Sequence, residues 1–226
     1  MALHLVIGNK NYSSWSMRPW IALKVAQIPF AETVIPIYRP DSKDKLLAYS
    51  PAGRVPILLD GDVRVWESLA ILEYLAETFP GAALWPKAPA ARAHARAIAN
   101  EMHAGFLPLR RHLPMNVWRP AQMRPLTSEA AANVTRIDAM WSDCRARFGQ
   151  GGPFLFGKFS AADAMYAPVV SRFQTYAVDV GPVARAYMDA VMALPAWKEW
   201  VAGALAEPWV LQDFEVDWPQ VKRVGR

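Results

Sequence analysis

The sequence predicts an α+β domain at its N-terminal end, followed by an all-α domain. Apolar runs of strand length alternate with helical stripes over residues 1–80, in the order β-α-β-α-β-β-α. Residues 82–91 are rich in proline and alanine, which is typical of a linker. Beyond this stretch the apolar patterns have a helical period. We therefore expect domains at residues 1–81 and 92–226, with residues 82–91 joining them.

A tight β-hairpin is the clearest local signal. Two short apolar runs, residues 57–59 and 63–65, flank Asp60-Gly61, a dipeptide that favours a two-residue turn. Val55-Pro56 precedes the first strand, and Glu67-Ser68 follows the second at the start of a helical stripe. This arrangement predicts a hairpin with a polar binding site at one end.

The first helix follows a loop rich in serine. Pro19 is tolerated only in the first turn of a helix, which places the start of this helix near Ser16. Ser13 and Ser14 then lie in the loop just before it, where free backbone N–H groups and the positive end of the helix dipole can hold an anion such as a thiolate. The alternative is that these serines only cap the helix, since serine is a preferred N-cap residue.

The remaining elements follow from the same patterns. In the first half we expect strands at residues 3–7 and 32–37, the second at a sheet edge because it contains Pro36, and a helix at residues 69–79.

In the second half we expect a helix at residues 92–112 with a kink at Pro108, and further helices at about 183–193 and 196–206 before an extended tail. Ser128 is expected to cap a long helix, and Ser160 with Asp163 forms a capping box. The stripe of the long helix is Val134, Ile137, Trp141, Cys144 and Phe148.

Composition excludes several classes of function. The net charge is +5, but the basic residues are dispersed, so nucleic-acid binding is not expected. The single cysteine, Cys144, excludes an intramolecular disulfide and falls on an apolar stripe, where a buried role is expected. The four histidines lack metal-ligand spacing. Without a charged and apolar leader or an apolar run of 18 residues, the sequence predicts a soluble, cytoplasmic protein with no membrane contact.

The order of elements and three motifs resemble the glutathione S-transferase superfamily. The motifs are the string from Ser13 to Arg18, Val55-Pro56 and Glu67-Ser68, and the first of them looks most like zeta-type bacterial members. Trp15 stands where zeta members carry a cysteine. The resemblance covers nearly the whole chain. It implies a thioredoxin-like N-terminal domain, an all-helical domain that contributes the electrophile site, glutathione as cosubstrate without a metal, and a homodimer.

Glutathione is a γ-glutamyl tripeptide with two carboxylates, one ammonium and a thiol, and candidates exist for each group. The Val55 N–H and C=O can pair with the cysteinyl amide if the bond to Pro56 is cis, which costs only about 0.5–1 kcal/mol before proline. Glu67 can hold the ammonium, while Ser68 at a helix N-terminus can hold the γ-glutamyl carboxylate. Arg54 or Lys43 can hold the glycyl carboxylate.

The thiol must also ionise. Lowering its pKa from about 8.5 to about 6.5 requires roughly 2.7 kcal/mol. A single hydrogen bond to a charged group supplies about 1.5–3 kcal/mol, so one serine hydroxyl with the helix dipole suffices. Ser13 ranks slightly ahead of Ser14, and Tyr12 is a third option whose ring is expected to pack. No cysteine lies in this loop, which argues against chemistry that needs a nucleophilic thiol there.

Three functions remain open. The first is a detoxifying glutathione transferase that attacks small hydrophobic electrophiles, with Trp15, His103, Phe106 and Arg110 lining the electrophile pocket. The second is a glutathione-dependent cis–trans isomerase of a maleylacetoacetate- or maleylpyruvate-type diketo acid, whose carboxylates Arg18 and Arg110 could hold. The third is a non-catalytic glutathione-binding protein.

Overall fold

The computed structural model describes residues 3–216, 219 and 222. Its N-terminal half contains a four-stranded mixed sheet in the order β2-β1-β3-β4. β1 pairs with β2 in parallel and with β3 antiparallel, and β3 and β4 form the expected hairpin. The predicted order β-α-β-α-β-β-α is confirmed. The elements are β1 (Leu3–Ile7), α1 (Ser14–Val25), β2 (Phe30–Val34), α2 (Ser42–Leu47), β3 (Ile57–Asp60), β4 (Val63–Trp66) and α3 (Ser68–Thr78).

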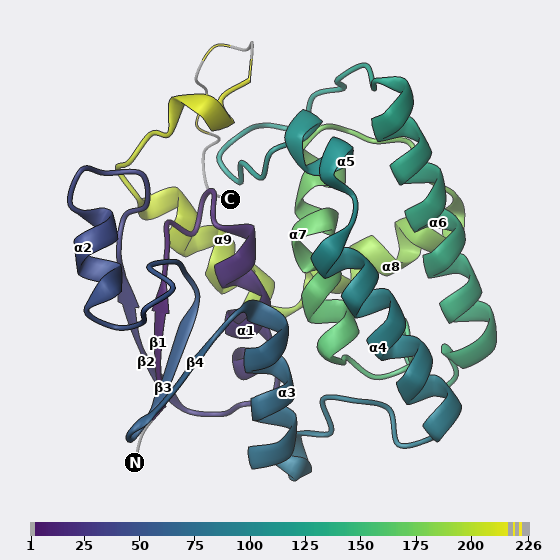
Figure 1. Ribbon diagram of the computed structural model, residues 1–226. Coiled ribbons are helices and arrows are strands. Elements are labelled where there is room, and N and C mark those ends of the chain that lie inside the picture. Colours follow the sequence, from purple (N-terminus) through teal and green to yellow (C-terminus); the bar gives the residue numbers. More distant parts are fainter. Residues whose placement is uncertain (1–2, 217–218, 220–221, 223–226) are drawn as a thin grey trace.

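Helices form the second half. They are α4 (Pro89–Ala104), α5 (Leu107–His112), α6 (Ser128–Phe148), α7 (Ala161–Thr175), α8 (Pro182–Ala193) and α9 (Pro195–Ala206), with short 3₁₀ turns at Pro80–Ala82 and Gln212–Phe214. Figure 1 shows the sheet on one side of the molecule and α4 to α8 on the other, with α1 and α3 between them. None of the helices in the described part of the chain combines the length and apolarity needed to span a membrane.

Helix α7 lies at the centre of the core. All of its residues except Gln174 are buried, and it packs against α1 of the first half as well as α4 and α8 of the second. Its start is fixed by the expected capping box, since the Asp163 carboxylate accepts hydrogen bonds from the Ser160 N–H and hydroxyl at 2.7 and 2.8 Å. Cys144 is fully buried, as expected, and burial raises the pKa of its thiol to about 12.

The start of α1 differs from the prediction. The helix begins at Ser14 with Ser13 as N-cap, so Pro19 lies inside it rather than in its first turn. Pro19 has no N–H to donate to the Trp15 carbonyl, a loss that normally disfavours such a position. Most of the helix is buried against α7, α3 and α9, and this packing outweighs the local proline penalty. The expected helix start near Ser16 was therefore wrong.

Smaller differences occur at other element ends. Instead of the kink expected at Pro108, the helix breaks two to three residues earlier, at Gly105 and Phe106, where Phe106 has φ 58°. Pro108 then falls in the first turn of α5. Thr127, not Ser128, caps α6. Strand β2 does lie at the sheet edge, but it ends before Pro36. Of the predicted tail, residues 217–218, 220–221 and 223–226 lie outside the described residues.

Candidate functional site

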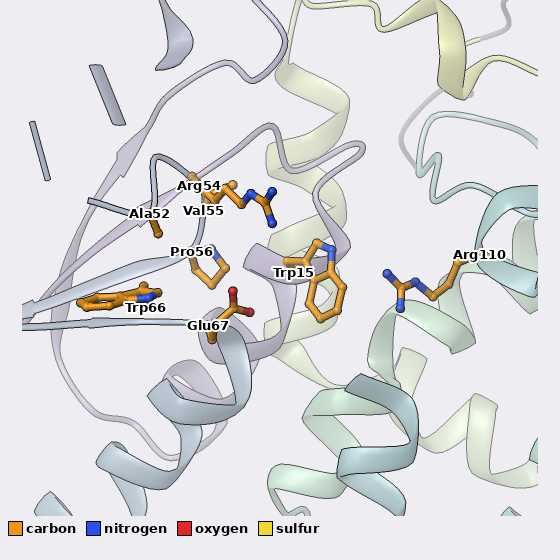
Figure 2. Close-up of a pocket in the computed structure, with 8 residues that line it drawn as sticks. All are labelled: Trp15, Ala52, Arg54, Val55, Pro56, Trp66, Glu67 and Arg110. Atoms are coloured by element: carbon orange, nitrogen blue, oxygen red, sulfur yellow. The ribbon is translucent and has the colours of Figure 1, made fainter. Parts of the chain in front are cut away.

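A cavity of about 230 Å³ lies where the hairpin, the start of α1 and helix α5 meet. Figure 2 shows the Trp15 side chain between Glu67 on one side and the guanidinium of Arg110 on the other. Six of the residues expected at the site from the sequence line this cavity. The complete lining is Trp15, Ala52, Arg54, Val55, Pro56, Trp66, Glu67 and Arg110.

Val55 offers main-chain groups at the cavity wall. The Val55–Pro56 bond is cis, the isomer that pairing of the Val55 main chain with a cysteinyl amide requires. Neither the N–H nor the C=O of Val55 bonds to another described residue, because ladder pairing of the sheet begins at Ile57. Two adjacent hydrogen-bonding groups are thus available to an extended peptide ligand. Arg54, beside Val55, is exposed and lines the same wall, whereas Lys43 is not among the lining residues.

Glu67 and Ser68 lie at the start of α3. Glu67 has φ 69°, a strained conformation for a residue other than glycine, and its carboxylate oxygen Oε2 lies 3.8 Å from Nε2 of His103. Ser68 is fully buried, and its Oγ accepts a hydrogen bond from Nη1 of Arg18 at 3.4 Å. Ser68 therefore lies beneath the cavity rather than on its wall.

Ser13 and Ser16 form a short chain of hydrogen bonds. The Gly8 N–H donates to Ser16 Oγ at 3.0 Å, and Ser16 Oγ lies 2.7 Å from Ser13 Oγ. Ser13 Oγ also accepts from the Ser16 N–H at 3.4 Å, as an N-cap does. When Ser16 donates its hydroxyl proton to Ser13, the Ser13 proton is left to donate to a further acceptor. Ser13 thus caps the helix and still retains a hydrogen-bond donor.

Ser13 also lies close to Val55. A Cβ atom built on Gly8 would be 3.1 Å from Val55 Cγ2 and 3.2 Å from Ser13 Cβ. Ser13 and Ser14 are 4% and 8% exposed and do not line the cavity themselves. The hydroxyl of Tyr12 instead donates to Glu215 at 2.7 Å, and burial with this carboxylate raises its pKa strongly.

Cationic side chains surround Trp15. The guanidinium carbons of Arg18 and Arg110 lie 4.0 and 4.7 Å from the Trp15 ring centre, and the His103 ring centre is 5.3 Å away. Arg18 is 1% exposed, with no carboxylate within ion-pair distance among the described residues. Burial, then Arg172 and Arg110, lowers its pKa. Burial, then Arg18, also lowers the pKa of His103.

Sequence reasoning missed several residues of this region. Phe106 is buried and outside the cavity lining, while Ala52 and Trp66 line it. Arg172 was missed because its charge comes near Arg18, whose pKa it lowers, only in the folded chain. Ser16 was expected to be the N-cap itself. It lies three residues after Ser13, which is the spacing between an N-cap and the N3 residue that donates to it. No group of three or more histidine, cysteine or acidic residues suited to a metal occurs within the described residues.

Two family models match the chain. The model of the glutathione S-transferase N-terminal domain matches residues 12–78, and that of the C-terminal domain matches residues 127–203. Together these segments cover most of the chain, and the fold has the same two parts. The chain belongs to the glutathione S-transferase family.

Individual relatives extend this result. A probable maleylacetoacetate isomerase of Caenorhabditis elegans is 43% identical over 98 residues, which are 43% of this chain and 45% of that protein. The chain thus spans about half the length of that relative. The maleylacetoacetate isomerase of Rattus norvegicus is 27% identical over 75% of this chain and 78% of the rat protein. The solved structure of a glutathione transferase homologue from Burkholderia, with bound glutathione, shares the fold (TM-score 0.67, 23% identity, 92% of this chain and all of that one).

Proposed function

We propose that the protein is a glutathione transferase in which the Ser13 hydroxyl stabilises the glutathione thiolate. The observation that carries this proposal is the N–H and C=O pair of Val55 at the wall of a cavity, which no other described residue binds, with the capping serine of α1 beside it. An extended tripeptide pairs with such an edge as an added strand does. Membership of the glutathione S-transferase family supports the same assignment.

The groups around Val55 match the two ends of glutathione. The Glu67 carboxylate holds the ammonium of the γ-glutamyl residue, and the backbone N–H groups at the start of α3 hold its carboxylate. Arg54 precedes Val55 in the sequence, whereas Glu67 follows it, and Arg54 holds the glycyl carboxylate. The cysteinyl sulfur then lies toward the N-terminus of α1.

The thiol proton leaves to water, and the Ser13 hydroxyl donates a hydrogen bond to the thiolate that remains. The hydrogen-bond chain from Gly8 through Ser16 polarises this donor. The thiolate attacks an electrophilic carbon, a C–S bond forms, and the leaving group departs with its electron pair. Trp15, His103 and Arg110 border the space that the electrophile occupies, and Phe106 supports it from the core.

Single and double substitution of Ser13 and Ser14 by alanine tests the serine mechanism. We expect Ser13→Ala to lower kcat/KM with a chlorodinitrobenzene-type electrophile by about 10- to 100-fold, the loss of one charge-assisted hydrogen bond. Ser14→Ala serves as the matched control and is expected to have a smaller effect. Unchanged turnover in both single variants and the double variant would refute the mechanism.

A second function is supported by the cationic side chains around Trp15. A maleyl-type diketo acid carries carboxylates, and Arg18 and Arg110 flank Trp15 without carboxylate partners among the described residues. In this reaction the thiolate adds to the cis double bond, the C–C bond rotates, and elimination returns glutathione with the trans product. The relatives named maleylacetoacetate isomerase support it. Turnover of maleylacetoacetate or maleylpyruvate, with a KM raised by Arg110→Met, tests it.

A binding protein without catalysis is the third outcome. Retention on a glutathione-affinity column together with no turnover of any of these substrates would establish it.

The assembly and location belong to the same proposal. We expect a cytoplasmic homodimer, an expectation that membership of the glutathione S-transferase family supports. We also expect domains at residues 1–81 and 92–226, joined through 82–91. Light scattering at micromolar concentration tests the dimer, and limited proteolysis tests the linker.

A further inference from the structure

The loop that leads into α1 is held by the far end of the chain. We call residues 8–13 the serine loop and residues 207–216 the C-terminal strap. The strap follows α9 and includes the 3₁₀ turn Gln212–Phe214. It lies outside both segments that the family models match.

Glu207 binds the serine loop through both carboxylate oxygens. Its Oε1 accepts the Lys10 N–H at 2.6 Å, and its Oε2 accepts the Asn11 N–H at 3.0 Å. Glu207 is 7% exposed, so little water competes for these bonds. Hydrogen bonds to an ionised carboxylate are about twice as strong as neutral ones. Two successive amides of the loop are thus fixed by one side chain.

Glu215 holds the next residue of the loop. Its carboxylate accepts the Tyr12 hydroxyl at 2.7 Å and Nδ2 of Asn116 at 2.9 Å, and it pairs with Nη2 of Arg119 at 2.7 Å. Glu215 and Arg119 are 1% and 3% exposed. The acceptor that orients Tyr12 is therefore itself fixed by two donors.

These contacts end immediately before Ser13. The Ser13 N–H donates to the Asn9 carbonyl at 2.8 Å, and its Oγ joins Ser16, which accepts from Gly8. A shift of residues 10–12 therefore moves Ser13 relative to Val55, on a different segment. Alignment of a hydrogen bond decides much of its strength, so the position of the loop controls how well Ser13 meets the sulfur.

We propose that Glu207 and Glu215 are positioning residues for Ser13. They hold the serine loop from the C-terminal strap and set the orientation of its hydroxyl toward the glutathione sulfur. This inference rests on the proposed role of Ser13 as the donor to the thiolate. Neither carboxylate touches glutathione.

The test compares Glu207→Gln and Glu215→Gln with the wild-type protein. The glutamine at 207 keeps one acceptor oxygen for two N–H donors, and its uncharged amide weakens the bond that remains. The readouts are the pKa of bound glutathione from the ultraviolet absorbance of its thiolate, the glutathione Kd, and kcat/KM below that pKa. Glu199→Gln on α9 and Asp213→Asn in the strap are matched controls, because both carboxylates are exposed.

We expect the pKa of the bound thiol to rise by about 0.5 to 1 unit in each variant, with kcat/KM reduced about three- to tenfold. The Kd should stay within about twofold, because the proposed contacts of Val55 and Glu67 lie on other segments. A purely structural strap would lower the melting temperature and leave the thiol pKa of the folded protein unchanged. Tyr12→Phe, which removes only the hydroxyl bound by Glu215, replaces Glu215→Gln if that variant does not fold.

The outcomes separate this inference from the proposed function. A thiol pKa equal to wild type in Glu207→Gln and in Glu215→Gln or Tyr12→Phe overturns the inference alone. A wild-type protein whose bound glutathione shows no thiolate, or a thiolate unaffected by Ser13→Ala, overturns the proposed function and this inference with it.

Discussion

Two regions of the site are built in opposite ways. The proposed glutathione edge, residues 54–68, is a hairpin whose strands are adjacent in the sequence, and its groups come from one short segment. The serine loop is fixed by carboxylates on Glu207 and Glu215, about two hundred residues away. We therefore propose that the edge sets the affinity for glutathione and that the loop sets the acidity of its thiol. Variants can separate the two.

The largest expected effect is on the pH dependence of stability. It comes from Asp163, which lies outside both regions and serves as a reference. Asp163 is fully buried, and burial raises its pKa from 3.8 to about 6. The folded state therefore binds more protons than the unfolded state between these values, so the contribution of Asp163 is most favourable below pH 4 and is lost as pH rises through 6. The free energy of unfolding falls by about 3 kcal/mol over this range because of Asp163.

Urea unfolding across this range checks the effect. Asp163→Asn should show a flatter profile and the same pKa for bound thiol as wild type. A profile as steep as that of wild type would contradict the burial argument.

Asp163 and Glu207 also show how far the sequence can predict this protein. Asp163 accepts from Ser160 three residues away, so the capping box was visible as a local pattern and was confirmed. The order of the elements along the first half and the hairpin were predictable for the same reason. Glu207 accepts from amides 197 and 196 residues away, and no local pattern marks it.

The same reasoning explains the error at α1. Pro19 is a strong local signal, and it indicated a helix start near Ser16. The buried packing of α1 against α7 overrode it, and the capping bond then fell on Ser13. The identity of the capping serine therefore depended on tertiary contacts, as did the gathering of Arg18 and Arg110 around Trp15.

Gly8 is the position where the two regions touch. A Cβ there would lie 2.9 Å from Ile37 Cγ2 and close to both Val55 and Ser13. We expect Gly8→Ala to lower the free energy of unfolding by about 1–2 kcal/mol through overpacking, and to raise both the glutathione Kd and the thiol pKa. Scanning calorimetry measures the stability, titration calorimetry measures the glutathione Kd, and thiolate absorbance measures the thiol pKa. A change in only the Kd or only the thiol pKa would show that the two regions are less closely coupled than the contacts imply.

Glu67→Gln isolates the edge. We expect the glutathione Kd to rise about tenfold, the lower end of the range for a hydrogen bond to a charged group, because the Glu67 side chain is 53% exposed. The thiol pKa should stay within about 0.3 units of wild type. Isothermal titration gives the Kd, and Glu129→Gln at the start of α6 controls for the loss of a carboxylate. An altered thiol pKa with an unchanged Kd would reverse the assignment of the two regions.

The central claim, that Ser13 stabilises the thiolate, is tested most directly by titrating glutathione bound to the wild-type protein and to Ser13→Ala. The absorbance of the thiolate is followed against pH at saturating glutathione. The account predicts a pKa near 6.5 in the wild-type protein, about 2 units below that of a free thiol, and a rise of about 1–2 units in Ser13→Ala. Equal pKa values in the two proteins would contradict it.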